Sequence, residues 1–135
     1  MKKFYLLLVL CFLAGLFVGC ASKESISKMN TSAEQVVRDY FKYQSEKNVA
    51  KLAEIMTPDK KNIAWEFEKL EYVNLISIHE KESSEENKKV FVVEFEIKFK
   101  NGSGSGLSDG KYPNYAILLI RDNASSPWLI YDWGY

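Results

Sequence analysis

The sequence predicts an α+β domain in which helices at its start pack against a curved, four-stranded antiparallel sheet. After a polar stretch ending near residue 30, apolar residues first recur at spacings of three and four, as on one face of a helix. Further along, apolar and polar residues alternate, as they do in strands. The strand-like segments are separated by short turns rather than by segments of helix length, so we expect hairpins rather than parallel crossovers.

Two helices are expected at the start of a domain spanning residues 31–135. Thr31 and Glu34 match a capping box, Thr-x-x-Glu, which satisfies free N–H groups at a helix start. Asn48 is a good cap for a second, shorter helix. A third short helical stretch is expected over about residues 58–67. One face of the first helix is expected to carry Ala33, Val36, Val37, Tyr40, Phe41 and Gln44.

Four strands are expected after the helices, over about residues 70–81, 89–100, 115–121 and 128–133. Residues 101–110 contain four glycines and three serines, which predicts a loop. The second strand alternates most cleanly. Its core-facing side is expected to carry Phe91, Val93, Phe95, Ile97 and Phe99.

The first residues predict an export signal over 1–19. Two lysines precede an apolar stretch of about fifteen residues, which is shorter than the roughly 20 residues that a membrane-spanning helix needs. The sequence Leu-Phe-Val-Gly-Cys over 16–20 resembles the signal peptidase II site, departing from it at Phe17. We therefore expect Cys20 to become the lipidated, palmitate-bearing first residue of the mature chain. Residues 20–30 would be a flexible tether, and the domain would lie at the extracytoplasmic face of the cell membrane.

The composition of the mature chain excludes several classes of function. Without Lys2 and Lys3 the balance is 16 basic against 18 acidic residues, a net charge of about −2, so no nucleic-acid partner is expected. Cys11 falls within the predicted signal and Cys20 would carry lipid, which leaves no free thiol. With His79 as the single histidine, no metal site and no cofactor are expected.

The helix start Ala-Glu-Gln-Val-Val over 33–37 and the ending Trp-Leu-Ile-Tyr-Asp-Trp-Gly over 128–134 resemble the nuclear transport factor 2-like superfamily, whose fold is a cystatin-like cone. More narrowly, they resemble small Gram-positive lipoproteins that form the domain-of-unknown-function 4829 family. The superfamily contains isomerases, dehydratases, ligand binders and non-catalytic partner domains. The resemblance therefore implies a fold more than an activity.

Asp132 is a weak candidate for catalysis. Strand alternation places it on one face with Trp128 and Ile130, where a carboxyl group would be desolvated and could stay protonated to donate a hydrogen bond. The alternative is an ordinary carboxylate at the end of a strand that accepts hydrogen bonds. His79 is expected at the surface or at a sheet edge, beside Glu80 and Glu82. Nothing in the sequence supplies it with the partner that a general base needs.

Two functions therefore remain open. The first is a non-enzymatic domain that binds a small molecule or a protein, with Trp65, Tyr72, Trp128 and Asp132 as candidate binding residues. The second is an isomerase- or dehydratase-type enzyme using Asp132 with Tyr40, Tyr72 or His79. In addition, the third and fourth strands are apolar on both faces, which predicts a homodimer through the sheet face or an equivalent contact with another protein.

Overall fold

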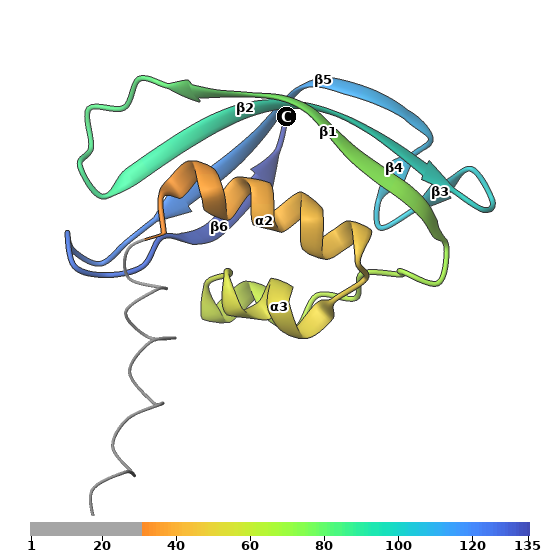
Figure 1. The fold of residues 1–135 in the computed structure, drawn as a ribbon, viewed down its shortest axis with the longest axis horizontal. Helices are drawn as coiled ribbons and strands as arrows, with labels where there is room; N and C mark the ends of the chain where they lie inside the picture. The colour runs from red at the N-terminus through yellow and green to blue at the C-terminus, as the bar shows by residue number, and fades with distance from the viewer. Residues whose placement is uncertain (1–30) are drawn as a thin grey trace, which may run out of the picture.

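The computed structural model describes residues 31–135; the predicted signal peptide, Cys20 and the tether lie outside the described residues. Three helical elements come first: α2 (Ala33–Ser45), α3 (Val49–Glu54) and the 3-10 turn η1 (Pro58–Lys60). The strands follow as β1 (Leu70–Lys81), β2 (Lys88–Phe99), β3 (Ser103–Gly104), β4 (Leu107–Ser108), β5 (Gly110–Ile120) and β6 (Leu129–Gly134). Figure 1 shows the helices gathered on one side of the sheet.

The main sheet is antiparallel and has the strand order β1-β2-β5-β6, so each strand lies beside its neighbour in the chain. The predicted α+β class with four antiparallel strands is confirmed. The loop expected over 101–110 contains the small β3–β4 hairpin, and β5 begins at Gly110, five residues earlier than expected. The five residues expected on the inner face of β2 are all buried.

The first helix starts one residue later than its sequence pattern suggested. Ser32, rather than Thr31, is the N-cap, and its side chain accepts a hydrogen bond from the Gln35 backbone N–H at 3.1 Å. Glu34 pairs with Arg38 one turn later, at 2.6 Å. The expected inner face of the helix is confirmed, since all six of its residues are buried.

The second helix is capped as predicted, because the Asn48 side chain accepts from the Lys51 N–H at 3.1 Å. The third helix expected over 58–67 is wrong: only the single turn η1 forms, and the chain then runs through turns to β1. A helix this short gains little from its own hydrogen bonds. The non-helical path instead buries Trp65 in the core cluster.

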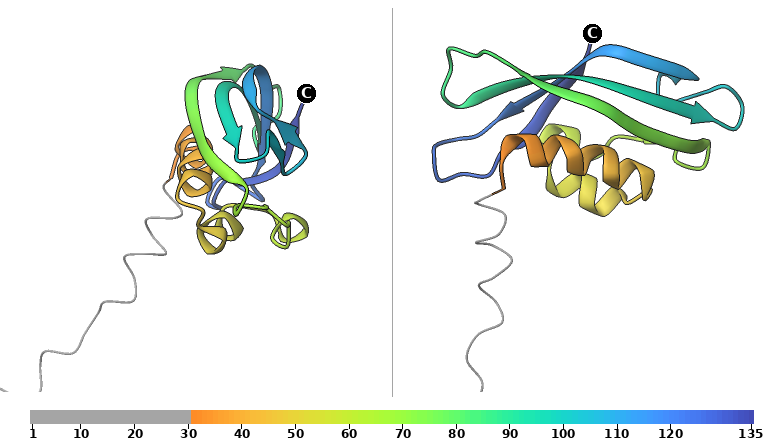
Figure 2. Two further views of the ribbon diagram at one scale, coloured as in Figure 1. Left: turned by 90° about the vertical axis from the view of Figure 1, so that its right-hand side faces the viewer. Right: turned by 45° about the horizontal axis from the view of Figure 1, so that its top comes forward.

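The sheet curves over α2, which lies across its concave face (Figures 1 and 2). Register shifts interrupt all three strand pairings, and such bulges bend a sheet and increase its local twist. The outer edge of β6 is also covered: Thr57 N–H donates to Ile130 O, and Ile130 N–H donates to Ile55 O, both at 2.9 Å. Within residues 31–135, no helix is long and apolar enough to cross a membrane.

Candidate functional site

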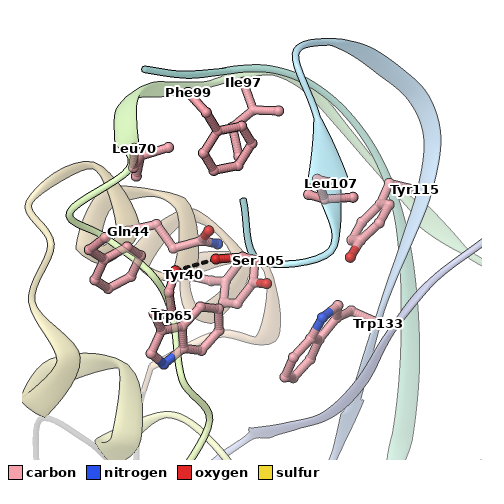
Figure 3. A pocket seen from close by; sticks show the side chains of 11 residues that line it. Tyr40, Gln44, Trp65, Leu70, Ile97, Phe99, Ser105, Leu107, Tyr115 and Trp133 are labelled. Carbon is pink, nitrogen blue, oxygen red and sulfur yellow. Dashed lines mark hydrogen bonds between the residues drawn. The ribbon is translucent and has the colours of Figure 1, made fainter. Parts of the chain in front are cut away.

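A pocket opens between α2, the segment that follows η1, and the β3–β4 hairpin. Its empty space is about 360 Å³, a value that includes the open mouth. The lining combines rings with aliphatic side chains and few polar groups, as Figure 3 shows. It consists of Tyr40, Gln44, Trp65, Phe67, Leu70, Ile97, Phe99, Ser105, Leu107, Tyr115 and Trp133.

Aromatic rings from distant parts of the chain meet at this pocket. Trp65 stacks on Trp133 with ring centroids 5.9 Å apart, and on Phe67 at 5.6 Å. Tyr40 approaches both tryptophans, at 6.1 and 6.0 Å. Contacts of this kind add about 0.5–1.5 kcal/mol each beyond simple burial, so the rings hold one another in place. The wall is therefore preorganised without a ligand.

The hydroxyls of Tyr40 and Tyr115 and the side-chain amide of Gln44 provide most of the polar character of the pocket. Burial raises the pKa of Tyr40 well above its usual range, although a hydrogen bond from the Gln44 side chain partly offsets this effect. Burial also raises the pKa of Tyr115 to about 12, with smaller contributions from Tyr135, Tyr112 and Asp132. Both hydroxyls are therefore neutral at physiological pH. Gln44 itself is only 8% exposed.

The β3–β4 hairpin closes one side of the pocket and is fastened at Ser105. The Ser105 hydroxyl donates to the Trp65 carbonyl, and its backbone N–H donates to a Glu66 carboxylate oxygen at 2.7 Å. Glu66 also pairs with Lys69. The Lys69 hydrogen bond, followed by the Ser105 N–H, lowers the pKa of Glu66, so this carboxylate is ionised in the folded protein.

The base of the hairpin packs tightly against β2. A Cβ atom placed on Gly104 would lie 2.7 Å from the Phe99 ring, so this close approach requires glycine. Asp109 accepts a hydrogen bond from the Phe99 N–H at 2.7 Å. The Tyr112 hydroxyl bonds both the N–H and the carbonyl of Ser108. The hairpin is thus an ordered wall of the pocket.

The expectation that Asp132 points toward the helices is wrong. Leu118 pairs with Asp132 and Leu119 pairs with Ile130, so Tyr131 is the extra residue of a bulge. The bulge reverses the alternation after Ile130, which turns Asp132 outward and brings Trp133 to the pocket. The Asp132 side chain is 58% exposed and lies 3.6 Å from Lys60.

The other candidate residues are widely separated. Trp65 lines the pocket, whereas Tyr72 is 41% exposed on β1 and His79 is exposed on the same strand. Trp128 is buried outside the pocket, with the Arg121 guanidinium 4.5 Å above its ring. Of the four proposed binding residues, the structure therefore places only Trp65 in the pocket.

Sequence reasoning missed Tyr115, Ser105 and Trp133 as pocket residues. Strand alternation assigned Trp133 to the outer face, and no local signal reveals the bulge at Tyr131 that reverses it. Ser105 lay in a segment expected to be plain loop. Across residues 31–135, no group of three or more His, Cys, Asp or Glu side chains is arranged to hold a metal ion.

The outer face of the sheet carries half-buried apolar side chains where β2, β5 and β6 adjoin. They are Val90, Val92, Ala116, Leu118, Ile120 and Leu129. His79 and Glu94 border this patch, and Ser77 pairs with Glu94. The apolar second face expected from the sequence is thus present on these three strands.

The fold and pocket define a small α+β domain whose concave sheet face holds a ring-lined cavity. The chain belongs to the family described as Domain of unknown function (DUF4829), whose sequence model matches residues 34–85 and 78–134. No curated protein matches the sequence. Among solved structures, RPA3114, a SEC-C motif containing protein from Rhodopseudomonas palustris, is similar at 13% identity with a TM-score of 0.47. That match covers 76% of this chain and 77% of the other.

Proposed function

We propose that this protein is an extracytoplasmic lipoprotein, anchored through lipid on Cys20, whose domain binds a small molecule and does not catalyse a reaction. The observation that carries the binding function is the pocket between α2 and the hairpin, where preorganised rings surround a small space. A concave, mostly apolar site with few polar groups is the usual form of a small-molecule site.

The chemistry of the lining favours binding over catalysis. Among the residues that line the pocket, the titratable groups are tyrosines, and burial favours the neutral form of Tyr40 and Tyr115. Isomerase or dehydratase chemistry would need a base or acid that changes protonation near neutral pH. Asp132, the carboxylate on which that alternative depended, is on the outer face of the sheet.

The same fold supports assignment to the nuclear transport factor 2-like superfamily. Helices at the start of the domain pack into the concave side of a bent antiparallel sheet, as the resemblance of residues 33–37 and 128–134 implies (Figure 2). We therefore propose that the domain is a member of this superfamily, with its cone-shaped fold.

Membrane anchoring is tested by metabolic labelling. Cells expressing the full chain are grown with an alkyne analogue of palmitate, and the protein is expected to take up label and to sediment with membranes. Cys20→Ser is expected to lose the label, because the thiol that receives the lipid is gone. Cys11→Ser is the matched control and should keep both properties. Equal labelling of wild type and Cys20→Ser would refute the anchor.

Small-molecule binding is tested through the three tryptophans. Trp65 and Trp133 line the pocket, whereas Trp128 lies outside it and serves as an internal reference. A ligand in the pocket is expected to shift the indole N–H resonances of Trp65 and Trp133 and to leave that of Trp128 in place. Equal shifts of all three indoles during a screen of small compounds would indicate nonspecific association.

A further inference from the structure

The size of the pocket restricts its ligand to a small compound. The space of about 360 Å³ includes the open mouth, so the volume available beneath the rings is smaller still. The stacked Trp65 and Trp133 present a flat apolar wall. A single ring is the shape that covers such a wall in so small a space.

The charges around the pocket restrict the ligand to a neutral compound. None of the residues that line it carries a charge at neutral pH. The charged groups near the rim already have partners: Lys60 pairs with Asp132, and Glu66 pairs with Lys69. A charged ligand would therefore lose its hydration without gaining a counter-ion, which is costly.

The Tyr115 hydroxyl is a polar group of the lining that is available to a ligand. Figure 3 shows it directed into the cavity, toward the space between Ser105 and Trp133. Among residues 31–135 it makes no hydrogen bond, whereas the Ser105 hydroxyl donates to the Trp65 carbonyl. A ligand oxygen reaching Tyr115 would satisfy a hydroxyl that is otherwise left to water.

We propose that the pocket binds a neutral ring compound carrying one hydroxyl group, with its ring against Trp65 and Trp133 and its oxygen hydrogen-bonded to Tyr115. This ligand class rests on the small-molecule binding function proposed above. The burial that keeps Tyr115 itself un-ionised acts equally on a bound hydroxyl, so the ligand is held in its neutral form.

The test compares p-cresol, toluene and 4-methylbenzoate, which share a methylated ring. On that ring p-cresol carries a hydroxyl, toluene carries no polar group, and 4-methylbenzoate carries a carboxylate. The full chain is reconstituted in lipid nanodiscs, free probe is measured in the aqueous phase, and binding is read from the Trp65 and Trp133 indole resonances. We expect p-cresol to bind about three- to tenfold more tightly than toluene, as one hydrogen bond allows. We expect 4-methylbenzoate to bind more weakly than either.

Tyr115→Phe isolates the hydrogen bond. This variant is expected to bring p-cresol to within about twofold of toluene while leaving toluene affinity unchanged. Tyr131→Phe, on the bulge of β6, is the matched control and should preserve the preference for p-cresol. The unfolding midpoint of each variant shows whether it has folded, and Trp128 reports nonspecific binding.

The outcomes separate the two proposals. If all three probes bind the pocket equally well, or if 4-methylbenzoate binds best, the proposed ligand class is overturned while small-molecule binding stands. An equal loss of p-cresol and toluene affinity in Tyr115→Phe also overturns the role of its hydroxyl. If no probe shifts the Trp65 and Trp133 indoles, both the ligand class and the binding function fail.

Discussion

At the scale of single residues, Tyr131 has the largest effect on the interpretation of the site. It occupies no functional position itself, but as the extra residue of a bulge it exchanges the faces of Asp132 and Trp133. A carboxylate is thereby replaced by an indole at the pocket. One unpaired residue thus changes a site suited to acid chemistry into one suited to binding rings.

Asp132→Asn is expected to change the free energy of unfolding by less than about 1 kcal/mol, because its ion pair with Lys60 is exposed to solvent. Ile130→Ala, two residues earlier on the same strand, is expected to cost about 2–5 kcal/mol, because Ile130 is fully buried. Urea denaturation followed by circular dichroism measures both. A loss for Asp132→Asn as large as that for Ile130→Ala would place the carboxylate in the core.

Tyr115 predicts a loss of stability at alkaline pH. Its pKa is about 12 in the folded protein against 10.0 for the ordinary group, so the unfolded chain releases this proton first as the pH rises. The stabilisation is fully present below about pH 10 and is lost between about pH 10 and 12. Tyr115→Phe is expected to lose less stability over that interval than wild type does, measured by urea denaturation at successive pH values.

Tyr72→Phe is the control for this measurement, because Tyr72 is exposed on β1 and lies outside the pocket. It removes one tyrosine hydroxyl and leaves the buried Tyr40 and Tyr115 in place. Tyr72→Phe is expected to lose stability as wild type does from pH 10 to 12. If Tyr115→Phe lost as much stability over this interval, the proton on Tyr115 would not be linked to folding.

At the scale of elements, the β3–β4 hairpin determines the shape of the pocket. Its closure depends on contacts with segments far away in the chain: Ser105 bonds Trp65 and Glu66, and Gly104 packs against Phe99. The hairpin also brings Leu107 into the lining. A segment that composition alone marks as loop therefore becomes structural through its tertiary contacts.

Gly104→Ala is expected to destabilise the protein by about 1–3 kcal/mol, because the new methyl group would lie 2.7 and 2.8 Å from two Phe99 ring atoms. The Phe99 ring must move, so the Trp65 indole resonance is also expected to shift. Ser103→Ala, at an exposed position of the same hairpin, should leave both properties unchanged. Tolerance of Gly104→Ala without either change would mean that the hairpin packs loosely.

At the scale of the whole molecule, the sheet has two apolar faces, and α2 covers one of them (Figure 1). The outer patch on β2, β5 and β6 supports the homodimer predicted from the sequence, because a single sheet with one covered face needs only one apolar side. A stable interface buries about 800 Å² on each partner.

Leu118→Lys is expected to convert such a dimer to a monomer, because it places a charge at the centre of the patch, between Val90 and Asp132 on the neighbouring strands. Sedimentation velocity of residues 31–135 at high concentration measures the oligomeric state. Lys98→Ala, on the same face but away from the patch, is the control and should have the same oligomeric state as wild type. A wild-type domain that sediments as a monomer would refute the homodimer.

The sequence by itself determined the α+β class, the first two helices, the Asn48 cap, the strand order and the buried face of β2. Each depends on hydrophobic period and local capping, which are properties of neighbouring residues. It also carries the lipidation signal around Cys20, which remains a prediction.

Only the tertiary structure decided the pocket. The non-helical path of residues 61–69, the ordered hairpin and the outward turn of Asp132 all arise from contacts between segments far apart in the chain. Trp65 and Trp133 are 68 positions apart in the chain, yet their ring centroids lie 5.9 Å apart. Burial of these rings outweighs the local preferences of the segments that carry them, because local propensities are worth a few tenths of a kcal/mol per residue and a buried ring several.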